Sequence, residues 1–123
     1  MNVASTAGTT GYPYTAAYTA SKHALVGLTR ALALETRKLG ITVNAVCPGW
    51  ADTAMTDESV RNIVKRTGRT PGEARETLAA MNPSGRLVRP EEVAAVVLRL
   101  VGDGAAGISG EAIAIDGGVV PPA

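Results

Sequence analysis

A tyrosine and a lysine stand four residues apart near the start of a long helical pattern, as Tyr18 and Lys22. On a helix, positions i and i+4 share one face, about 5–6 Å apart at Cβ, so both side chains point the same way. A cation beside a tyrosine favours the phenolate, which suits the phenol to acid–base work near neutral pH. The spacing alone more often marks a solvated helix face, so the interpretation depends on its surroundings.

A serine upstream of this pair supplies a third polar group. Ser5 lies in a short run that contains Gly8 and Gly11. A hydroxyl on such a loop can turn back to the phenol of Tyr18 and donate to a substrate carbonyl, so that three groups converge on one oxygen. The competing interpretation of Ser5 is an ordinary turn serine after a short strand. Tyr14 is a poorer acid than Tyr18, because no lysine follows it by four residues.

Three ordered stretches resemble the short-chain dehydrogenase/reductase family, in its compact branch of 3-oxoacyl, polyketide-type and 3-hydroxy-acid reductases. They are Ser5 with the Tyr-x-x-x-Lys pair, Val-Asn-Ala-Val-Cys-Pro-Gly-Trp-Ala-Asp-Thr at 43–53, and Ile-Ala-Ile-Asp-Gly-Gly at 113–118. The resemblance covers nearly the whole chain but only the family's second half. It implies an α/β fold, the C-terminal half of a Rossmann-like doubly wound parallel sheet that lacks the N-terminal dinucleotide-binding half.

The resemblance also implies the role of each polar group. Tyr18 becomes the proton donor or acceptor, and Ser5 orients and polarises the carbonyl. Lys22 favours the ionised form of the tyrosine and binds the nicotinamide ribose. The implied reaction reduces a carbonyl, of 3-oxoacyl or similar type, or oxidises the matching secondary alcohol with NADP or NAD. The substrate would be a small carbonyl or alcohol, or an acyl thioester, and no metal is implied.

The cofactor loop is expected after a buried strand. The apolar run 41–46 between Gly40 and Pro48 is typical of a parallel strand that follows a helix, and open α/β sheets bind ligands at the carboxyl ends of such strands. By resemblance, Pro48, Gly49 and Thr53 lie under the nicotinamide, together with Tyr18 and Lys22. A Pro-Gly pair alone is usually an ordinary turn.

The family's Gly-rich turn, which receives the cofactor pyrophosphate at a helix N-terminus, precedes the catalytic serine by many residues. Here the serine is the fifth residue, so the resemblance predicts a fragment, a misplaced start or one piece of a split protein. Cofactor binding by this chain alone is then in question. The alternative function is a catalytically incomplete fragment that serves only as an interaction or oligomerisation module. A dehydratase or epimerase fits less well, given the Asp-Gly-Gly ending and the compact length.

The chain reads as one partial domain, 1–123, in three segments: a catalytic loop, helix and strand at 1–52, a substrate-lid insert at 53–83, and the last helix, last strand and tail at 84–123. Periodicity predicts helices over 16–39, 57–66 and 71–81, a further helix opened by Arg-Pro-Glu-Glu at 89–92, and a strand at 113–115. The loop 6–15 is expected to be irregular, and the tail 119–123 is expected to carry no regular structure.

Several side chains are assigned a structural place. Asn44 is expected to be a buried amide that ties neighbouring segments together, and Arg86 is expected to be structural. The residues expected to face inward in the three later helices are Val60, Ile63, Val64, Leu78, Met81, Val93, Val97 and Leu100.

The amino-acid composition limits the kinds of binding partner that the chain is expected to have. The 12 Lys and Arg residues nearly balance the 11 Asp and Glu residues and are not clustered, so nucleic acid is not indicated. No run of about 18 apolar residues is present, so no membrane span is predicted. The single cysteine, Cys47, fits a reducing compartment, and a cytoplasmic location is expected. The resemblance implies a homo-oligomer, a dimer or tetramer of the full-length parent, with the helix at 16–39 in a subunit interface.

Overall fold

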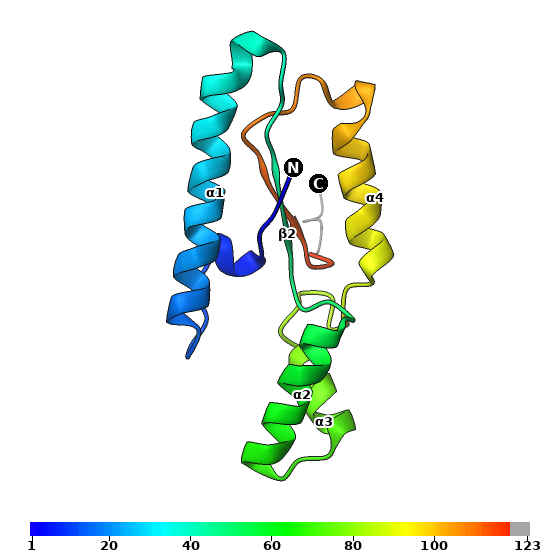
Figure 1. Cartoon of the computed structure of the whole chain (residues 1–123). Helices are drawn as coiled ribbons and strands as arrows, with labels where there is room; N and C mark the ends of the chain where they lie inside the picture. The colour runs from blue at the N-terminus through cyan, green and yellow to red at the C-terminus, as the bar shows by residue number, and fades with distance from the viewer. Residues whose placement is uncertain (119–123) are drawn as a thin grey trace.

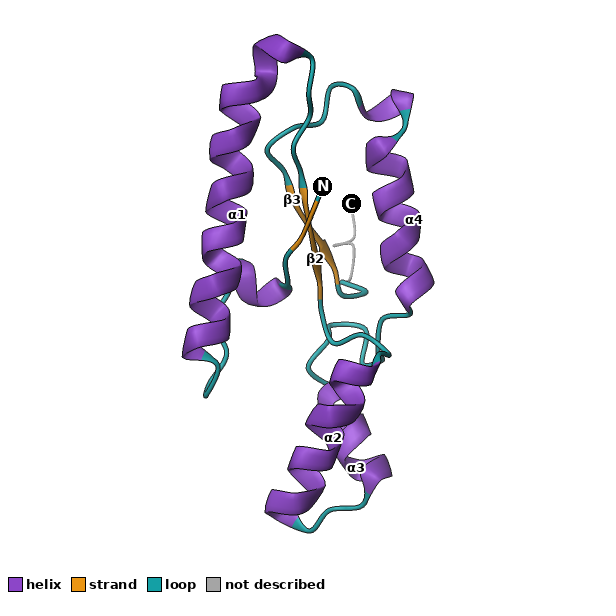
Figure 2. Ribbon diagram, in the orientation of Figure 1, coloured by secondary structure: helices purple, strands orange, loops and turns teal. Residues whose placement is uncertain are grey.

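The structure, a computed structural model, describes residues 1–118. Within that range the elements run β1 (Asn2–Val3), η1 (Thr6–Gly8), α1 (Ala16–Thr36), η2 (Arg37–Leu39), β2 (Ala45–Pro48), α2 (Ala54–Thr67), α3 (Pro71–Ala79), α4 (Pro90–Val101), η3 (Asp103–Ala105) and β3 (Ala112–Ile115), where η marks a 3₁₀ helix. Helices α1 and α4 lie on opposite sides of the strands, and the α2–α3 pair projects from one end (Figures 1 and 2).

The three strands form a parallel sheet in the order β1-β2-β3. Asn2 pairs with Ala45, and Ala45 pairs in turn with Ala112 on the other side. Parallel strands need a long crossover, and α1 and α4 supply the two crossovers here. The predicted class, an α/β fold that forms part of a Rossmann-like parallel sheet, is confirmed.

Helix α1 packs on the sheet through small side chains. Its buried residues are Val26, Thr29 and Ala33, and Val26 joins a cluster with Ala4, Ala45 and Cys47. Leu25 packs against this cluster, whereas Leu28, Leu34 and Leu39 are exposed by 51%, 68% and 71%. Small residues permit a close approach of the helix to the strands, and Leu28 and Leu39, eleven residues apart, are left exposed on one side of the helix.

The second strand starts later than the sequence predicts. The expected strand was 41–46, whereas β2 comprises Ala45–Pro48. Residues 41–44 are irregular because their polar groups bond to the segment before β3: the Val43 amide donates to the hydroxyl of Ser109 and the amide of Gly110 donates to the carbonyl of Val43. Asn44 is buried as predicted, donating to the Ile108 carbonyl at 2.8 Å and accepting from the Glu111 amide at 3.1 Å.

Two further differences concern the first helix and the loop before it. The loop at 6–15 was expected to be irregular, but Thr6–Gly8 forms a single 3₁₀ turn. The long helix ends at Thr36 and continues to Leu39 as 3₁₀ helix. Gly40 ends it with φ 69°, the left-handed conformation that glycine adopts without a steric cost, as the sequence predicts.

Helices α2 and α3 form a hairpin with its own small core. Val60, Ala74 and Leu78 are buried together, with Trp50 packed against them. Helix α3 begins as predicted at Pro71, and Thr70 and Glu73 form a reciprocal capping box. The prediction that Met81 points inward was wrong. It is 51% exposed because α3 ends at Ala79, so Met81 lies beyond the helix face that carries Leu78.

Helix α4 covers the other face of the sheet. Leu100 is buried, and Val93 and Val97 are half-buried, on the side predicted. The guanidinium of Arg86 holds the carboxylate of Glu92 with two hydrogen bonds of 2.8 and 2.7 Å, which gives Arg86 a structural role. The predicted tail, 119–123, lies outside the described residues. Within residues 1–118, no helix is both long enough and apolar enough to cross a membrane.

The Glu92 carboxylate should make the free energy of unfolding depend on pH. Its hydrogen bonds to Arg86, then to the Arg89 amide, lower its pKa from 4.5 to about 2. A carboxylate with a lowered pKa stabilises the fold fully above its unfolded pKa, and that contribution fades as pH falls from about 4.5 to about 2. We expect Glu92→Gln to lower the free energy of unfolding at pH 7 and to lose that deficit across this window.

Urea unfolding at a series of pH values measures this effect. Glu91→Gln is the matched control, because Glu91 stands in the same first turn of α4 and makes no ion pair within residues 1–118. A Glu92→Gln deficit that stayed constant from pH 7 to pH 2 would contradict the assignment.

Candidate active site

The residues predicted to do chemistry gather at the carboxyl edge of the sheet. Ser5 follows β1, and Pro48 ends β2, so both lie at the edge where parallel strands finish. Helix α1 begins at the same edge, beside η1, and brings Tyr18 and Lys22 in its first turns (Figure 1). Three segments that are far apart in the sequence thus meet at one edge.

Lys22 faces both the strand end and the tyrosine. Its ammonium nitrogen donates to the carbonyl of Val3 at 3.2 Å and lies 5.6 Å from the centre of the Tyr18 ring. Tyr18 is 42% exposed, so its phenol is accessible from outside the fold. One carbonyl uses one of the three ammonium donors, and the others remain available to a ligand.

The hydroxyl of Ser5 bonds to the backbone of its own turn. It accepts a hydrogen bond of 3.1 Å from the Ala7 amide and caps the 3₁₀ turn η1. Within the described residues it makes no hydrogen bond with Tyr18. The structure therefore brings Ser5 to the edge that carries Tyr18 and Lys22 without joining the two hydroxyls. Its own O–H is still a donor for a third group.

The loop between Ser5 and Tyr18 is held by Tyr12 and strained at Tyr14. The phenol of Tyr12 donates to the Thr6 hydroxyl at 3.1 Å, which secures the loop to η1. Tyr14 has φ 62°, a left-handed conformation that is uncommon for a bulky residue, and its side chain is fully exposed. Neither residue replaces Tyr18 beside Lys22.

Gly8 and Cys47 show how closely the segments that carry the site residues are packed. A Cβ placed on Gly8 would lie 2.8 Å from the Lys22 carbonyl oxygen, so η1 and α1 touch through backbone. Cys47 is completely buried in β2, and this burial raises the pKa of its thiol. A backbone hydrogen bond from Ser5 and the charges of Arg30 and Lys22 oppose that rise. A buried thiol of raised pKa packs rather than reacts.

The predicted cofactor loop leaves the end of β2 and enters α2. Thr53 is the N-cap of α2, in an extended conformation, and its side chain makes no capping hydrogen bond. Its hydroxyl is therefore not used in capping, and the first amides of this 14-residue helix have no capping side chain from Thr53. Gly49 donates its amide to the Ile115 carbonyl at 3.0 Å, which fixes this loop to β3.

Two residues that the sequence analysis did not select hold this loop. Asn82 is 4% exposed and bonds to both backbone groups of Trp50. Arg75 of α3 forms ion pairs with Asp52 in the loop and Asp57 in α2. Neither residue belongs to a local motif. Their partners are 32 and 23 residues distant, so spacing along the chain gave no signal for them.

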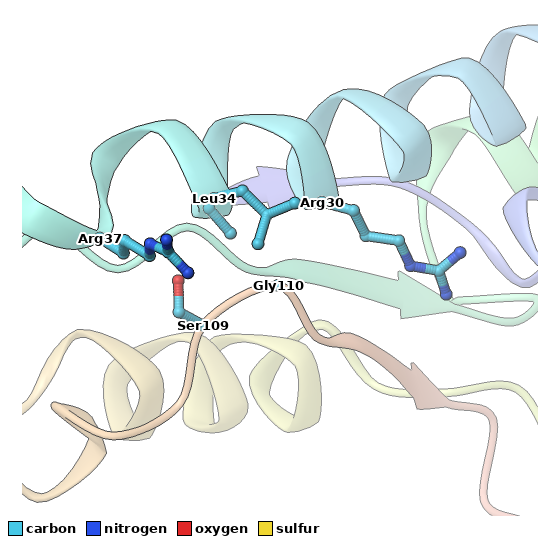
Figure 3. Close-up of a pocket in the computed structure, with 6 residues that line it drawn as sticks. Arg30, Leu34, Arg37, Ser109 and Gly110 are labelled. Atoms are coloured by element: carbon cyan, nitrogen blue, oxygen red, sulfur yellow. The ribbon is translucent and has the colours of Figure 1, made fainter.

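A separate groove of about 380 Å³ lies between α1 and the turn before β3. Figure 3 shows the Arg37 side chain beside Ser109, with Arg30 directed toward the other end. The lining residues are Arg30, Ala33, Leu34, Arg37, Ser109 and Gly110. None of them is a predicted site residue. Within residues 1–118, no group of three or more His, Cys, Asp or Glu side chains is placed to hold a metal.

A parallel sheet with a Tyr-x-x-x-Lys pair and a serine at its carboxyl edge defines an α/β protein of the Rossmann type. Residues 1–120 match the family described as enoyl-(acyl carrier protein) reductase. The chain belongs to the short-chain dehydrogenase/reductase family.

Known relatives agree with this assignment. The chain is 40% identical to a 3-oxoacyl-(acyl-carrier-protein) reductase of Thermotoga maritima, over 98% of its own length and 44% of the relative. A variant of actinorhodin polyketide ketoreductase with NADPH is 44% identical, with a TM-score of 0.88 over 94% of this chain and 44% of that one. A 4-hydroxyisoleucine dehydrogenase complexed with NADH is 32% identical, with a TM-score of 0.77 over 99% and 46%. The chain thus spans less than half of each.

The contact between Gly8 and Lys22 can be tested by adding one methyl group. Gly8→Ala should lower the free energy of unfolding by about 1–3 kcal/mol, because the methyl meets backbone atoms that cannot move aside. Gly11→Ala is the control, since nothing lies within 4 Å of a Cβ there. Urea unfolding compares the two, and equal effects would argue against the close contact of η1 with α1.

Proposed function

We propose that the chain carries the proton-transfer site of an NAD(P)-dependent oxidoreductase, which reduces a ketone of the 3-oxoacyl or a similar type or oxidises the matching secondary alcohol. The observation that carries the proposal is the position of Lys22, 5.6 Å from the Tyr18 ring, at the sheet edge that also holds Ser5. The ketoreductases and dehydrogenases among its relatives support this reaction class. The substrate is a small carbonyl or alcohol, or an acyl thioester.

The residues present fit a nicotinamide cofactor. Lys22 has ammonium donors beyond the one that Val3 accepts, which suits the ribose hydroxyls. Thr53 offers a hydroxyl without a capping bond at the start of α2, which suits a carboxamide or a phosphate. In this proposal Pro48 and Gly49 lie under the nicotinamide. One similar structure holds NADPH and another NADH, and both are consistent with these contacts.

Each residue then has a defined task in reduction. When bound, a nicotinamide cofactor would supply the hydride for the carbonyl carbon. The phenol of Tyr18 donates its proton to the carbonyl oxygen, so that the ketone becomes a secondary alcohol. Ser5 donates a hydrogen bond to the same oxygen, and the ammonium of Lys22 stabilises the phenolate that remains. Oxidation of the alcohol reverses each transfer.

A second function is favoured by the apolar outer face of α1. Leu28 and Leu39 are both more than half exposed and lie on one side of the helix and its 3₁₀ extension. Exposed apolar side chains that share a face are typical of association surfaces. We infer that α1 also pairs copies of the chain in a homo-oligomer. This role needs no cofactor, so it is the function that remains if catalysis is absent.

Cofactor binding is tested with the intrinsic fluorescence of Trp50, the only tryptophan and the neighbour of Gly49. We expect saturable quenching when the purified chain is titrated with NADPH or NADH, because the cofactor would lie beside the loop that carries the indole. The absence of quenching up to millimolar cofactor would reject cofactor-dependent catalysis by this chain and leave the association role.

The phenol is tested in a preparation that binds cofactor. Tyr18→Phe should retain binding and lower the rate of ketone reduction by at least about 10²-fold, the range of general acid catalysis. Tyr14→Phe, the control, removes a phenol that lies four residues away and should leave the rate unchanged. Reduction by Tyr18→Phe at the parent rate would refute the role of Tyr18.

Association is measured by sedimentation equilibrium. Leu28→Gln should weaken self-association at least about tenfold, because it replaces an exposed leucine of α1 with a polar group. Met55→Gln changes an equally accessible apolar side chain, 67% exposed, on α2 and should have no effect. If both variants behave as the parent chain does, α1 is not the pairing surface.

A further inference from the structure

Asn82 is a buried amide whose two polar atoms are both occupied by backbone groups. It lies in the turn after α3 and is 4% exposed. Its carbonyl oxygen accepts from the Trp50 amide at 2.9 Å. Its amide nitrogen donates to the Trp50 carbonyl at 2.8 Å and to the Arg86 carbonyl at 2.7 Å. Buried amides with full complements of this kind fix the segments that they join.

The paired bonds to Trp50 imitate a strand partner. In a sheet, one residue exchanges an N–H and a C=O with its neighbour, and the Asn82 side chain makes the same exchange with Trp50. Backbone bonds continue the pairing: the Val88 amide donates to the Trp50 carbonyl at 2.9 Å, and the Asp52 amide donates to the Val88 carbonyl at 2.8 Å. The loop after β2 is thereby held against the segment that enters α4.

Gly49 fits against the same amide. A Cβ on Gly49 would collide with the Asn82 oxygen and would lie 3.0 Å from the Asp116 Cβ. The next residue, Trp50, places its side chain in the core of the α2–α3 hairpin, against Val60 and Leu78. The loop is therefore fixed on three sides, by Asn82, by β3 and by the hairpin core.

We propose that Asn82 is the positioning residue of the cofactor loop. By bonding to both backbone groups of Trp50, it fixes the position of the neighbouring Pro48 and Gly49 at the sheet edge that carries Tyr18. This inference rests on the proposed function, in which these two residues lie under the nicotinamide. Asn82 touches the loop and not the ligand, so its effect on a ligand is indirect.

The first experiment measures the loop and the ligand separately. Asn82→Ala leaves the Trp50 amide without its acceptor, and we expect its hydrogen exchange to accelerate at least about tenfold. The dissociation constant of NADPH, measured by isothermal titration calorimetry, should rise by about tenfold or more. Asn62→Ala is the control, an exposed asparagine on α2 with no side-chain hydrogen bond within residues 1–118, and should change neither value.

Two further variants distinguish positioning from general stability. Asn82→Gln keeps a carboxamide that can both accept from the Trp50 amide and donate to the Trp50 carbonyl, and should restore part of the slow exchange. It also covers the case in which Asn82→Ala does not fold. Gly49→Ala should weaken NADPH binding much more in the parent chain than in the Asn82→Ala background, because the smaller side chain removes the oxygen with which the methyl collides.

The outcomes separate the two proposals. Unchanged Trp50 exchange in Asn82→Ala overturns the positioning role, whatever the cofactor does. Faster exchange with an unchanged NADPH dissociation constant reduces Asn82 to a structural residue and also overturns it. A third outcome is that the parent chain does not bind NADPH, although Trp50 exchanges slowly in the parent chain and fast in Asn82→Ala. This outcome overturns the proposed function and the ligand part of this inference. Only the hold of Asn82 on the loop is then retained.

Discussion

The parallel pairing of β1 with β2 is the constraint on which the candidate site depends. Asn2 donates to the Asn44 carbonyl at 2.9 Å, and Ala4 donates to the Val46 carbonyl at 2.8 Å. Because the strands run in the same direction, whatever follows β1 must lie beside whatever follows β2. The helix that connects them must start at that edge too, which is why α1 carries its tyrosine and lysine there. The convergence of the polar groups is thus a property of strand direction, and no single side-chain contact is needed to create it.

Close approach of backbone to backbone then decides how near these groups come. Gly8 permits contact between η1 and the carbonyl of Lys22. The buried face of α1 is made of small side chains, so the helix packs close to the strands; these residues are Val26, Thr29 and Ala33. The Lys22 ammonium can then reach the Val3 carbonyl at the end of β1. Larger residues at these positions would gain more buried apolar area but would separate the lysine from the strand end. The close contact of α1 with the strands is thus made by small side chains and Leu25, while Leu28, Leu34 and Leu39 lie outside it.

Local patterns in the sequence predicted most of the fold and the core of the site. The i, i+4 spacing placed Tyr18 beside Lys22, Gly40 and Pro71 marked a helix end and a helix start, and the run before Pro48 indicated a buried strand. Errors arose where a distant partner overrode the local pattern. Ser109 and Gly110 take the backbone groups of Val43, so the strand begins after residue 44 and not at 41. The Ser5 hydroxyl accepts from the Ala7 amide and keeps its O–H as a donor, so its role at the substrate carbonyl stays a prediction. Asn82 and Arg75 could not be found at all, because their partners depend on how the hairpin folds back.

The hairpin adds a second level of organisation to the site. Its core of Val60, Ala74 and Leu78 is separate from the cluster that joins α1 to the sheet, and Trp50 is the apolar side chain that reaches it from the cofactor loop. Arg75 makes a polar link to the same loop through Asp52. This ion pair is solvent-exposed and contributes little to stability by itself, whereas the Trp50 contact is apolar and half-buried. The hairpin is therefore joined to the loop by one apolar contact, one buried amide and one exposed ion pair, so a displacement of the hairpin would have to break these contacts or displace the loop with it. If the hairpin covers the substrate, as the sequence predicts, the segment over the substrate and the segment under the cofactor share one set of supports.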